Sequence, residues 1–239
     1  MAILNSIIGI LFIFAVAYLL SNNKKHIKWR TIIIGFLIQF GFALIVLKWS
    51  VGRYVLSKVA LGVQGVISYA NEGIGFVFGS LTNDGSIFVV NVLCVIIFIS
   101  AVVSILYYLG IMQFIIRVIG GALSKLLGTS QLETISASAN IFLGQTEAPL
   151  LIKPYVAKLT ESELFTVMVG GLASVSGSIL VGYSLLGIPI EYLISASFMA
   201  APAGLIISKM LYPETEFDKI QNEVKMVKDD SANVVDAAS

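Results

Sequence analysis

A short polar segment, Asn140–Glu147, interrupts a stretch of sequence that is otherwise apolar enough to enter a membrane. It places an amide at Gln145, a hydroxyl at Thr146 and a carboxylate at Glu147 in three consecutive positions. Together these groups offer hydrogen-bond donors and acceptors to a polar solute. A carboxylate at membrane depth is costly unless it is paired, so it indicates a functional role. The segment is therefore the first candidate for a binding site.

Two short arms flank this segment and are expected to position it. The first, Ser130–Leu143, predicts a half-helix that begins with a capping box, because Glu133 follows its first residue by three positions. Gly144 and Pro149 then disfavour a continuous helix, and Ala148–Leu159 predicts a second short helix with lysines towards its far end. Each arm reaches only about 20 Å, too short to cross a bilayer alone. The sequence therefore predicts a re-entrant hairpin that enters from the cytoplasm.

The bend of such a hairpin presents polar groups at membrane depth. Irregular backbone survives there only where protein or a water-filled cavity satisfies it. Broken helices of this kind form the substrate and ion sites of many secondary transporters. Gln145, Thr146 and Glu147 share the bend with amides at the start of the second arm. The alternative is an ordinary cytoplasmic loop in which Glu147 is solvated, but the arms are too apolar to favour a free loop.

A second unusual stretch, VGGLASVSGSILVGYS, lies in the next apolar segment. The hydroxyls of Ser174, Ser176 and Ser178, with any carbonyls that a helix break frees, are hard oxygen ligands that suit a cation. Small residues at these spacings also let two helices approach closely. From the residues alone, tight helix packing is the more common explanation, and cation binding is the alternative.

The composition of the chain sets the class of protein in which these segments lie. Hydrophobic residues make up 57% of the 239 positions and charged residues 12%, about half the charged fraction of a soluble domain. Such a chain cannot cover its surface with polar groups, so we expect the lipid bilayer to be its solvent. A net charge of +1 argues against a nucleic-acid partner. One histidine and a cysteine, Cys94, in an apolar run give no nucleophile–base pair, so we do not expect an enzyme.

Five apolar segments approach the length of about 20 residues that a membrane-spanning helix needs. They are Ala2–Leu20, Thr31–Leu47, Ser86–Ile111, Leu164–Gly187 and Tyr192–Leu211. Their only charged residue, Lys209, lies near an end from which it is expected to snorkel to the interface. The basic cluster at 24–30 predicts a cytoplasmic first connection. The fold class that follows is an all-α integral membrane protein with about five transmembrane helices, an interfacial helix and a re-entrant helical hairpin.

The order of several motifs resembles that of one family. The runs SASANIFLGQTEAPLLIKPY, SELFTVMVGGLASVSGSIL and SFMAAPAGLIISKMLYPETE are similar to the first half of the concentrative nucleoside transporters, and NEGIGFVFG and IIFISAVVSILYYLGIMQ precede them in the family's order. The resemblance covers essentially the whole chain, and GQTEAP is its most specific part. It implies a cation-coupled symporter that carries nucleosides inward across the plasma (inner) membrane. It also implies a homotrimer with one pathway per subunit and no cofactor.

The resemblance assigns the nucleobase to the bend of the hairpin. The residues it implies there are Gly144, Gln145, Thr146 and Glu147. Their chemistry suits that role, because an amide both donates and accepts hydrogen bonds and a carboxylate accepts from base N–H groups.

The resemblance also implies a sodium site made by the end of the first arm and an unwound part of the following span. Its ligands are the side chains of Asn140 and Ser174 and the carbonyls of Leu143 and Val175. All four offer the oxygen that a hard cation requires. Members of the family that use protons lack this set, so its presence favours sodium over the alternative, a proton.

The resemblance implies an order of parts along the chain, from which one part of the family's pattern is missing. The expected parts are a two-helix scaffold region (1–49), an interfacial helix with a Gly-rich turn (50–85), a long scaffold helix (86–118), the first half of a transport domain (119–211) with its hairpin at 130–159, and an acidic cytoplasmic linker (212–239). Family members add a second hairpin with ribose-binding residues, which these 239 residues do not contain. The alternative function is therefore a transport-inactive, truncated or scaffold membrane subunit that needs a partner chain. The preferred nucleoside and the roles of Asn71 and Glu72 stay open.

Overall fold

The computed structural model describes residues 2–79, 89–145, 147–220 and 233–237, and every regular element in these ranges is helical. The α-helices are α1 (Ala2–Leu19), α2 (Trp29–Leu47), α3 (Ser50–Phe78), α4 (Cys94–Tyr108), α5 (Ile111–Leu127), α6 (Gln131–Ala139), α7 (Glu161–Leu172), α8 (Gly177–Leu185), α9 (Ile190–Leu211) and α10 (Val234–Ala237). The π-helix η3 (Val89–Leu93) leads into α4, and the 3-10 helices are η1 (Lys24–His26), η4 (Ala148–Lys158) and η5 (Phe217–Lys219).

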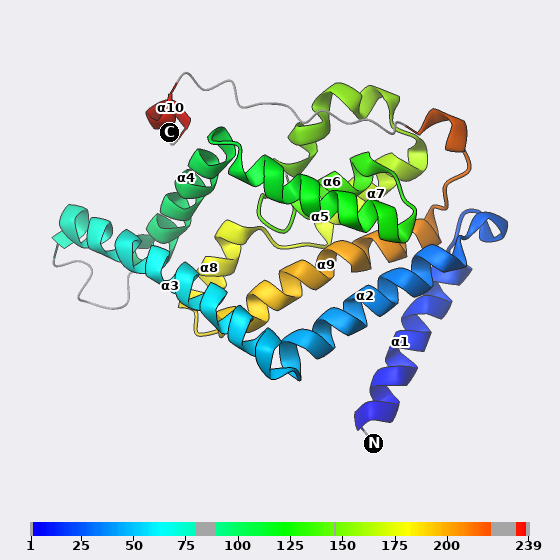
Figure 1. Ribbon diagram of the computed structural model, residues 1–239, viewed down its shortest axis with the longest axis horizontal. Coiled ribbons are helices and arrows are strands. Elements are labelled where there is room, and N and C mark those ends of the chain that lie inside the picture. The colour runs from blue at the N-terminus through cyan, green and yellow to red at the C-terminus, as the bar shows by residue number, and fades with distance from the viewer. Residues whose placement is uncertain (1, 80–88, 146, 221–232, 238–239) are drawn as a thin grey trace.

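Helices α2 and α9 run side by side and form the spine of the molecule (Figure 1). A Cβ atom added to Gly35 of α2 would lie 2.6 Å from Cγ1 of Ile206 on α9. The glycine therefore lets the two helices approach closely, as small residues do in membrane helix pairs. Helix α1 also contacts α9 and diverges from the body of the molecule towards the N-terminus (Figure 1).

Within the described residues, three helical stretches are long and apolar enough to cross a membrane: Trp29–Val46, Val89–Tyr108 and Ile190–Leu211. They correspond to three of the five predicted spans. The first predicted span is a shorter apolar helix, Leu4–Leu19. These stretches support insertion into a membrane, which the all-helical architecture suits.

The prediction of one continuous span over 164–187 is wrong. Helix α7 ends at Leu172, the backbone is irregular from Ala173 to Ser176, and α8 begins at Gly177. Serines favour such a break because their hydroxyls offer other hydrogen bonds to the backbone, and glycines favour it because the helix restricts their backbone at a high cost in entropy. The unwound part that the resemblance implied in this span is therefore present.

Two other local predictions need correction. The expected Gly-rich turn at 71–79 is helical as far as Phe78, because Ile74 is buried on the inner face of α3, and the helix ends only at Gly79, where φ is +55°. The long scaffold helix expected at 86–118 is bent, because Gly110 has φ +80°, a conformation that favours glycine. Helices α4 and α5 meet at this corner (Figure 1). Residues 80–88 lie outside the described ranges.

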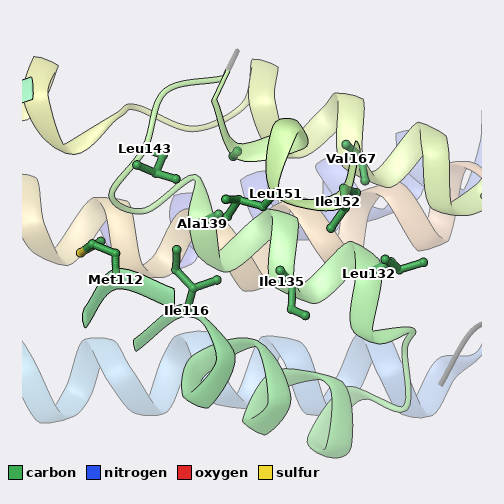
Figure 2. Close-up of a cluster of buried hydrophobic side chains, with 10 residues drawn as sticks. Met112, Ile116, Leu132, Ile135, Ala139, Leu143, Leu151, Ile152 and Val167 are labelled. Atoms are coloured by element: carbon green, nitrogen blue, oxygen red, sulfur yellow. The ribbon is translucent and has the colours of Figure 1, made fainter. Parts of the chain in front are cut away.

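One hydrophobic cluster packs against both arms of the hairpin. Its buried members come from α5, α6, the η4 arm and α7: Met112, Ile116, Leu132, Ile135, Ala139, Leu143, Ala148, Leu151, Ile152 and Val167. Figure 2 shows these side chains gathered between α5, α6 and the η4 arm. The core therefore holds both arms of the predicted hairpin at 130–159. The first arm is α-helical only to Ala139, four residues short of the predicted end.

Candidate functional site

Two capping boxes mark the base of the hairpin. Ser130 accepts a hydrogen bond from the backbone N–H of Glu133, and the Ser130 N–H donates to Glu133 Oε1 at 2.7 Å. The same pattern recurs where α7 begins, with the Thr160 N–H donating to Glu163 Oε2 at 3.0 Å. The sequence predicted the first box and not the second. Each box ends the irregular backbone on one side of the hairpin by satisfying amides at a helix start.

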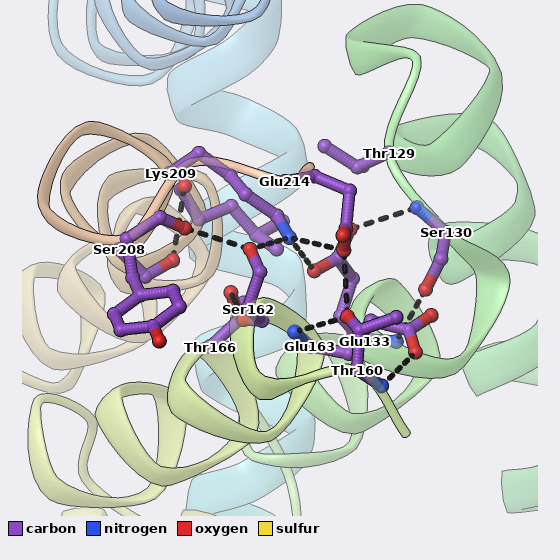
Figure 3. A network of polar contacts seen from close by, with 12 residues as sticks. Thr129, Ser130, Glu133, Thr160, Ser162, Glu163, Thr166, Ser208, Lys209 and Glu214 are labelled. Carbon is purple, nitrogen blue, oxygen red and sulfur yellow. Dashed lines mark hydrogen bonds and ion pairs between the residues drawn. The ribbon is translucent and has the colours of Figure 1, made fainter. Parts of the chain in front are cut away.

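A buried lysine joins the two boxes (Figure 3). Lys209 Nζ on α9 lies 2.6 Å from Glu133 Oε2 and donates to Ser162 Oγ at 2.8 Å. Its side chain is 9% exposed and that of Glu133 is 1% exposed. The predicted snorkelling of Lys209 to the interface is therefore wrong, since the ammonium group is used inside the protein.

Glu214, just after α9, completes this network. Its Oε2 accepts a hydrogen bond from Thr160 Oγ1 at 2.6 Å and lies 4.0 Å from Lys209 Nζ. Ser162 Oγ in turn donates to the carbonyl oxygen of Tyr212 at 2.7 Å. We call the side chains of Glu133, Thr160, Ser162, Lys209 and Glu214 the basal clasp. It ties both ends of the hairpin to the end of α9.

The bend of the hairpin lies open rather than buried. Gln145 and Glu147 are exposed, and Glu147 Oε2 accepts a hydrogen bond from the Gly144 N–H at 3.2 Å. A Cβ atom added to Gly171 would lie 3.3 Å from Cβ of Gln145, so α7 borders the bend. Three of the four predicted nucleobase residues are thus adjacent, and Thr146 lies outside the described residues. The exposed amide and carboxylate are available to hydrogen-bond a solute.

Asn140 has the opposite environment. Its side chain is 1% exposed, and neither Oδ1 nor Nδ2 has a hydrogen-bond partner among the residues that the structure describes. A Cβ atom added to Gly170 would lie 3.2 Å from Nδ2, so α7 passes directly beside the amide. Burial of an unpaired amide costs free energy. Such a group in a folded protein calls for a ligand or an ordered water.

The break between α7 and α8 lies against the bend of the hairpin. The Gly177 N–H donates to the Phe142 carbonyl oxygen at 3.1 Å, which ties the start of α8 to the hairpin. Ser174 Oγ donates to the Gly170 carbonyl oxygen at 2.7 Å, beside the glycine that borders Asn140. The structure therefore brings the two predicted halves of the cation site, residues 140–143 and 174–175, to adjoining breaks in the backbone.

The other two serines predicted as possible cation ligands are Ser176 and Ser178. Ser176 is buried where α8 begins, and the side chain of Ser178 lies outside the described part of the structure. The roles of two polar residues of α9 were not predicted: Lys209, which pairs inside the clasp, and Ser197, whose hydroxyl donates to the Ile141 carbonyl oxygen at 3.1 Å. A lysine and a serine within an apolar helix were the signal for both, since buried polar groups need partners.

Comparisons with known proteins find matches along nearly the whole chain. Three family models match successive parts of the chain: the Na+ dependent nucleoside transporter N-terminus at residues 8–81, nucleoside recognition at 89–189, and the Na+ dependent nucleoside transporter C-terminus at 192–239. The boundary between the first two models falls before α4, and the second covers the whole hairpin and the helix break.

Individual relatives and a solved structure also match the chain over nearly its full length. The chain is 54% identical to an uncharacterized transporter, YutK, of Bacillus subtilis (100% of this chain, 60% of the relative), and 46% identical to the nucleoside permease NupC of Helicobacter pylori (93% and 55%). The solved structure of CNTnw in an inward-facing substrate-bound state is 48% identical, with a TM-score of 0.95 over 100% of this chain and 60% of that one. The chain thus spans between half and two thirds of the length of these relatives. It belongs to the family of concentrative nucleoside transporters.

Proposed function

We propose that the chain carries the sodium-binding and nucleobase-binding part of a nucleoside symporter that takes up nucleosides across the plasma (inner) membrane. One observation carries the proposal: the Asn140 amide is buried without a partner among the described residues, beside the ends of two helices. Helix α6 ends at Ala139 and α7 at Leu172. The C-terminal end of a helix has a partial negative charge, which favours a cation. Ends of broken helices with freed carbonyls are also what transporters use to hold sodium.

The donor set fits sodium. Asn140 offers Oδ1, Ser174 offers a hydroxyl oxygen, and Leu143 and Val175 offer carbonyls, all neutral oxygens that a hard cation prefers. A proton would instead need a titratable group, and none of these four residues has one. When bound, the ion would supply the partner that the Asn140 amide oxygen otherwise lacks. The substrate would bind at the exposed bend through Gly144, Gln145, Thr146 and Glu147.

Entry of the hairpin from the cytoplasmic side is part of the proposal. The Asn22 N–H donates to the Leu211 carbonyl oxygen at 2.8 Å, so the basic first connection lies at the end of α9. A small cavity of about 30 Å³ beside it is lined both by His26 and Lys28 of that connection and by Glu133 of the hairpin base. Both ends of the hairpin thus lie at the basic end of the molecule, which the positive-inside rule places in the cytoplasm. The arrangement supports a re-entrant hairpin in a multi-pass protein.

The proposed activity is tested by uptake of radiolabelled uridine into cells that express the protein, with an inward sodium gradient or with potassium instead. We expect uptake that depends on sodium, and binding of uridine by the purified protein in a thermal-shift assay. A protein that assembles into a homotrimer in native mass spectrometry but neither binds nor transports uridine would be the transport-inactive scaffold subunit instead. Uptake that follows a proton gradient and ignores sodium would contradict the choice of ion.

The substitution Asn140→Leu distinguishes a role of Asn140 in sodium binding from a role in the stability of the fold. We expect the variant to lose all stabilisation by sodium chloride relative to potassium chloride, because the buried amide oxygen is gone. In potassium chloride its Tm should equal or exceed that of the unchanged protein, since an unpaired buried amide is replaced by an apolar group of similar size. The measurement is thermal unfolding in detergent over a series of sodium concentrations, with the exposed change Asn71→Leu as control. A lower Tm in potassium would show that Asn140 serves the fold rather than an ion.

A further inference from the structure

The hydroxyl of Ser197 lies between the two breaks that make up the proposed cation site. Ser197 is 3% exposed, and its Oγ donates to the Ile141 carbonyl oxygen at 3.1 Å. The same Oγ lies 3.5 Å from the Val175 carbonyl oxygen, at the limit of a hydrogen bond. Ile141 belongs to the bend after α6, and Val175 to the irregular backbone between α7 and α8. One hydroxyl of α9 therefore faces one carbonyl from each break.

The residue that follows Ser197 holds the same bend by a different contact. The ring of Phe198 meets the ring of Phe142 edge to face, with centroids 5.9 Å apart, and stacks on Phe42 of α2 at the same distance. Two consecutive residues of α9 thus contact two consecutive residues of the hairpin. Because α9 packs along α2 through the close approach at Gly35, this anchor is part of the spine rather than of a free loop.

We propose that Ser197 is a positioning residue for the cation site: it holds the bend of the hairpin and the broken span at the separation at which their oxygens bind one ion. The inference rests on the proposed sodium site. It adds Ser197 to that site as a residue that does not itself coordinate the ion. A hydroxyl has one proton, so Ser197 donates to one carbonyl at a time. The shorter distance shows that this carbonyl is that of Ile141. The Val175 carbonyl, a proposed ligand, is then left beside the hydroxyl and free to turn to the ion.

Loss of the Ser197 hydroxyl should weaken sodium binding and leave uridine binding unchanged. In Ser197→Ala the bend loses its hydrogen bond to α9, and the ligands on the two sides are no longer held in register. Because one buried hydrogen bond is involved, we expect the sodium concentration for half-maximal stabilisation to rise by a factor of about 3 to 10. The described hydrogen bond of the Glu147 side chain goes to the Gly144 N–H and does not involve Ser197, so uridine affinity at saturating sodium should not change.

The experiment measures Tm of the purified protein against sodium concentration, without nucleoside, for the unchanged protein and two serine variants. Ser195→Ala is the matched control, because this buried serine of the same helix donates, within the described structure, to the Glu191 carbonyl oxygen one turn earlier. We expect its sodium dependence to match that of the unchanged protein. A residue that serves only the fold would lower Tm equally at all sodium concentrations, whereas a positioning residue shifts the midpoint.

Three results decide between the possibilities. A midpoint in Ser197→Ala equal to that in Ser195→Ala overturns the role of Ser197 and leaves the sodium site standing. A lower midpoint also overturns it, because it would mean that the hydroxyl competes with the ion for the Val175 carbonyl. If the unchanged protein shows no dependence on sodium relative to potassium, the proposed cation site itself fails, and the inference fails with it.

Discussion

Replacing Lys209 by methionine should lower the free energy of unfolding by about 3–5 kcal/mol, which is the cost of removing one partner from a buried ion pair. Methionine keeps most of the length of the lysine side chain, so the change removes the charge and leaves little empty space. What remains is the carboxylate of Glu133, 1% exposed, without its counter-ion at 2.6 Å. Glu214 would add a second carboxylate nearby. For a chain of this size the loss corresponds to a fall in Tm on the order of 10 °C.

The matched control is Lys219→Met. Lys219 also pairs with a carboxylate at 2.7 Å, that of Glu216, but both side chains are exposed. Exposed pairs contribute little to stability, so thermal unfolding of this variant should be indistinguishable from that of the unchanged protein. A double variant that also carries Glu133→Gln should recover part of the loss, because the uncompensated charge is then gone. Equal Tm values for Lys209→Met and Lys219→Met would show that the basal clasp does not hold the hairpin.

The basal clasp combines a contact that local sequence predicts with one that depends on tertiary packing. Ser130 and Glu133 are three residues apart, and their capping box is visible in the sequence because a helix start is a local event. Lys209 is distant from both, and only the packing of α9 against α6 and α7 brings them together. A lone lysine in an apolar helix is compatible with snorkelling or with burial. The choice depends on whether acidic side chains lie within reach, which the sequence alone does not state.

The same reasoning explains the helix ends. Two local predictions, the turn at 71–79 and the continuous span at 164–187, were wrong because tertiary contacts decide where these helices end. At 71–79 three glycines suggested a turn, yet burial of Ile74 keeps the segment helical to Phe78. At Gly177 the helix break was missed by hydropathy, because the residues on both sides are apolar. There a Cβ atom would lie 2.8 Å from the Phe142 carbonyl oxygen, so the glycine is required by a partner from the hairpin rather than by its own neighbours.

Candidate site residues stand out in the sequence for a physical reason. Polar residues such as Asn140 and Glu147 in an apolar context are rare and costly, so their presence points to function even when the surrounding geometry is unknown. The structure shows that the two residues differ in burial. Asn140 is buried without a described partner, and Glu147 is exposed at the bend. The sequence could not separate these environments, because both residues lie on the same short segment.

The second large effect is expected for Glu147→Gln, which should weaken uridine binding by a factor on the order of 10 to 100. The amide keeps the shape of the side chain and can still accept from the Gly144 N–H, as Glu147 Oε2 does at 3.2 Å. It loses the charge, however, and hydrogen bonds to a charged acceptor are stronger by an amount that corresponds to such a factor. Because Glu147 is exposed, the Tm without ligand should not change. The measurement is uridine binding at saturating sodium, with Glu72→Gln, an exposed change on α3, as control.

The pair of variants Glu147→Gln and Asn140→Leu tests whether the hairpin has two separate functions. Sodium stabilisation measured without nucleoside should be normal in the first variant and absent in the second. Binding at two sites is coupled through a shared free energy, so each site has to be titrated with the other ligand either absent or saturating. If Glu147→Gln instead removed the response to sodium, the carboxylate at the bend would be part of the ion site. The exposed end of the hairpin would then serve the cation, and burial of the Asn140 amide without a partner among the described residues would need another explanation.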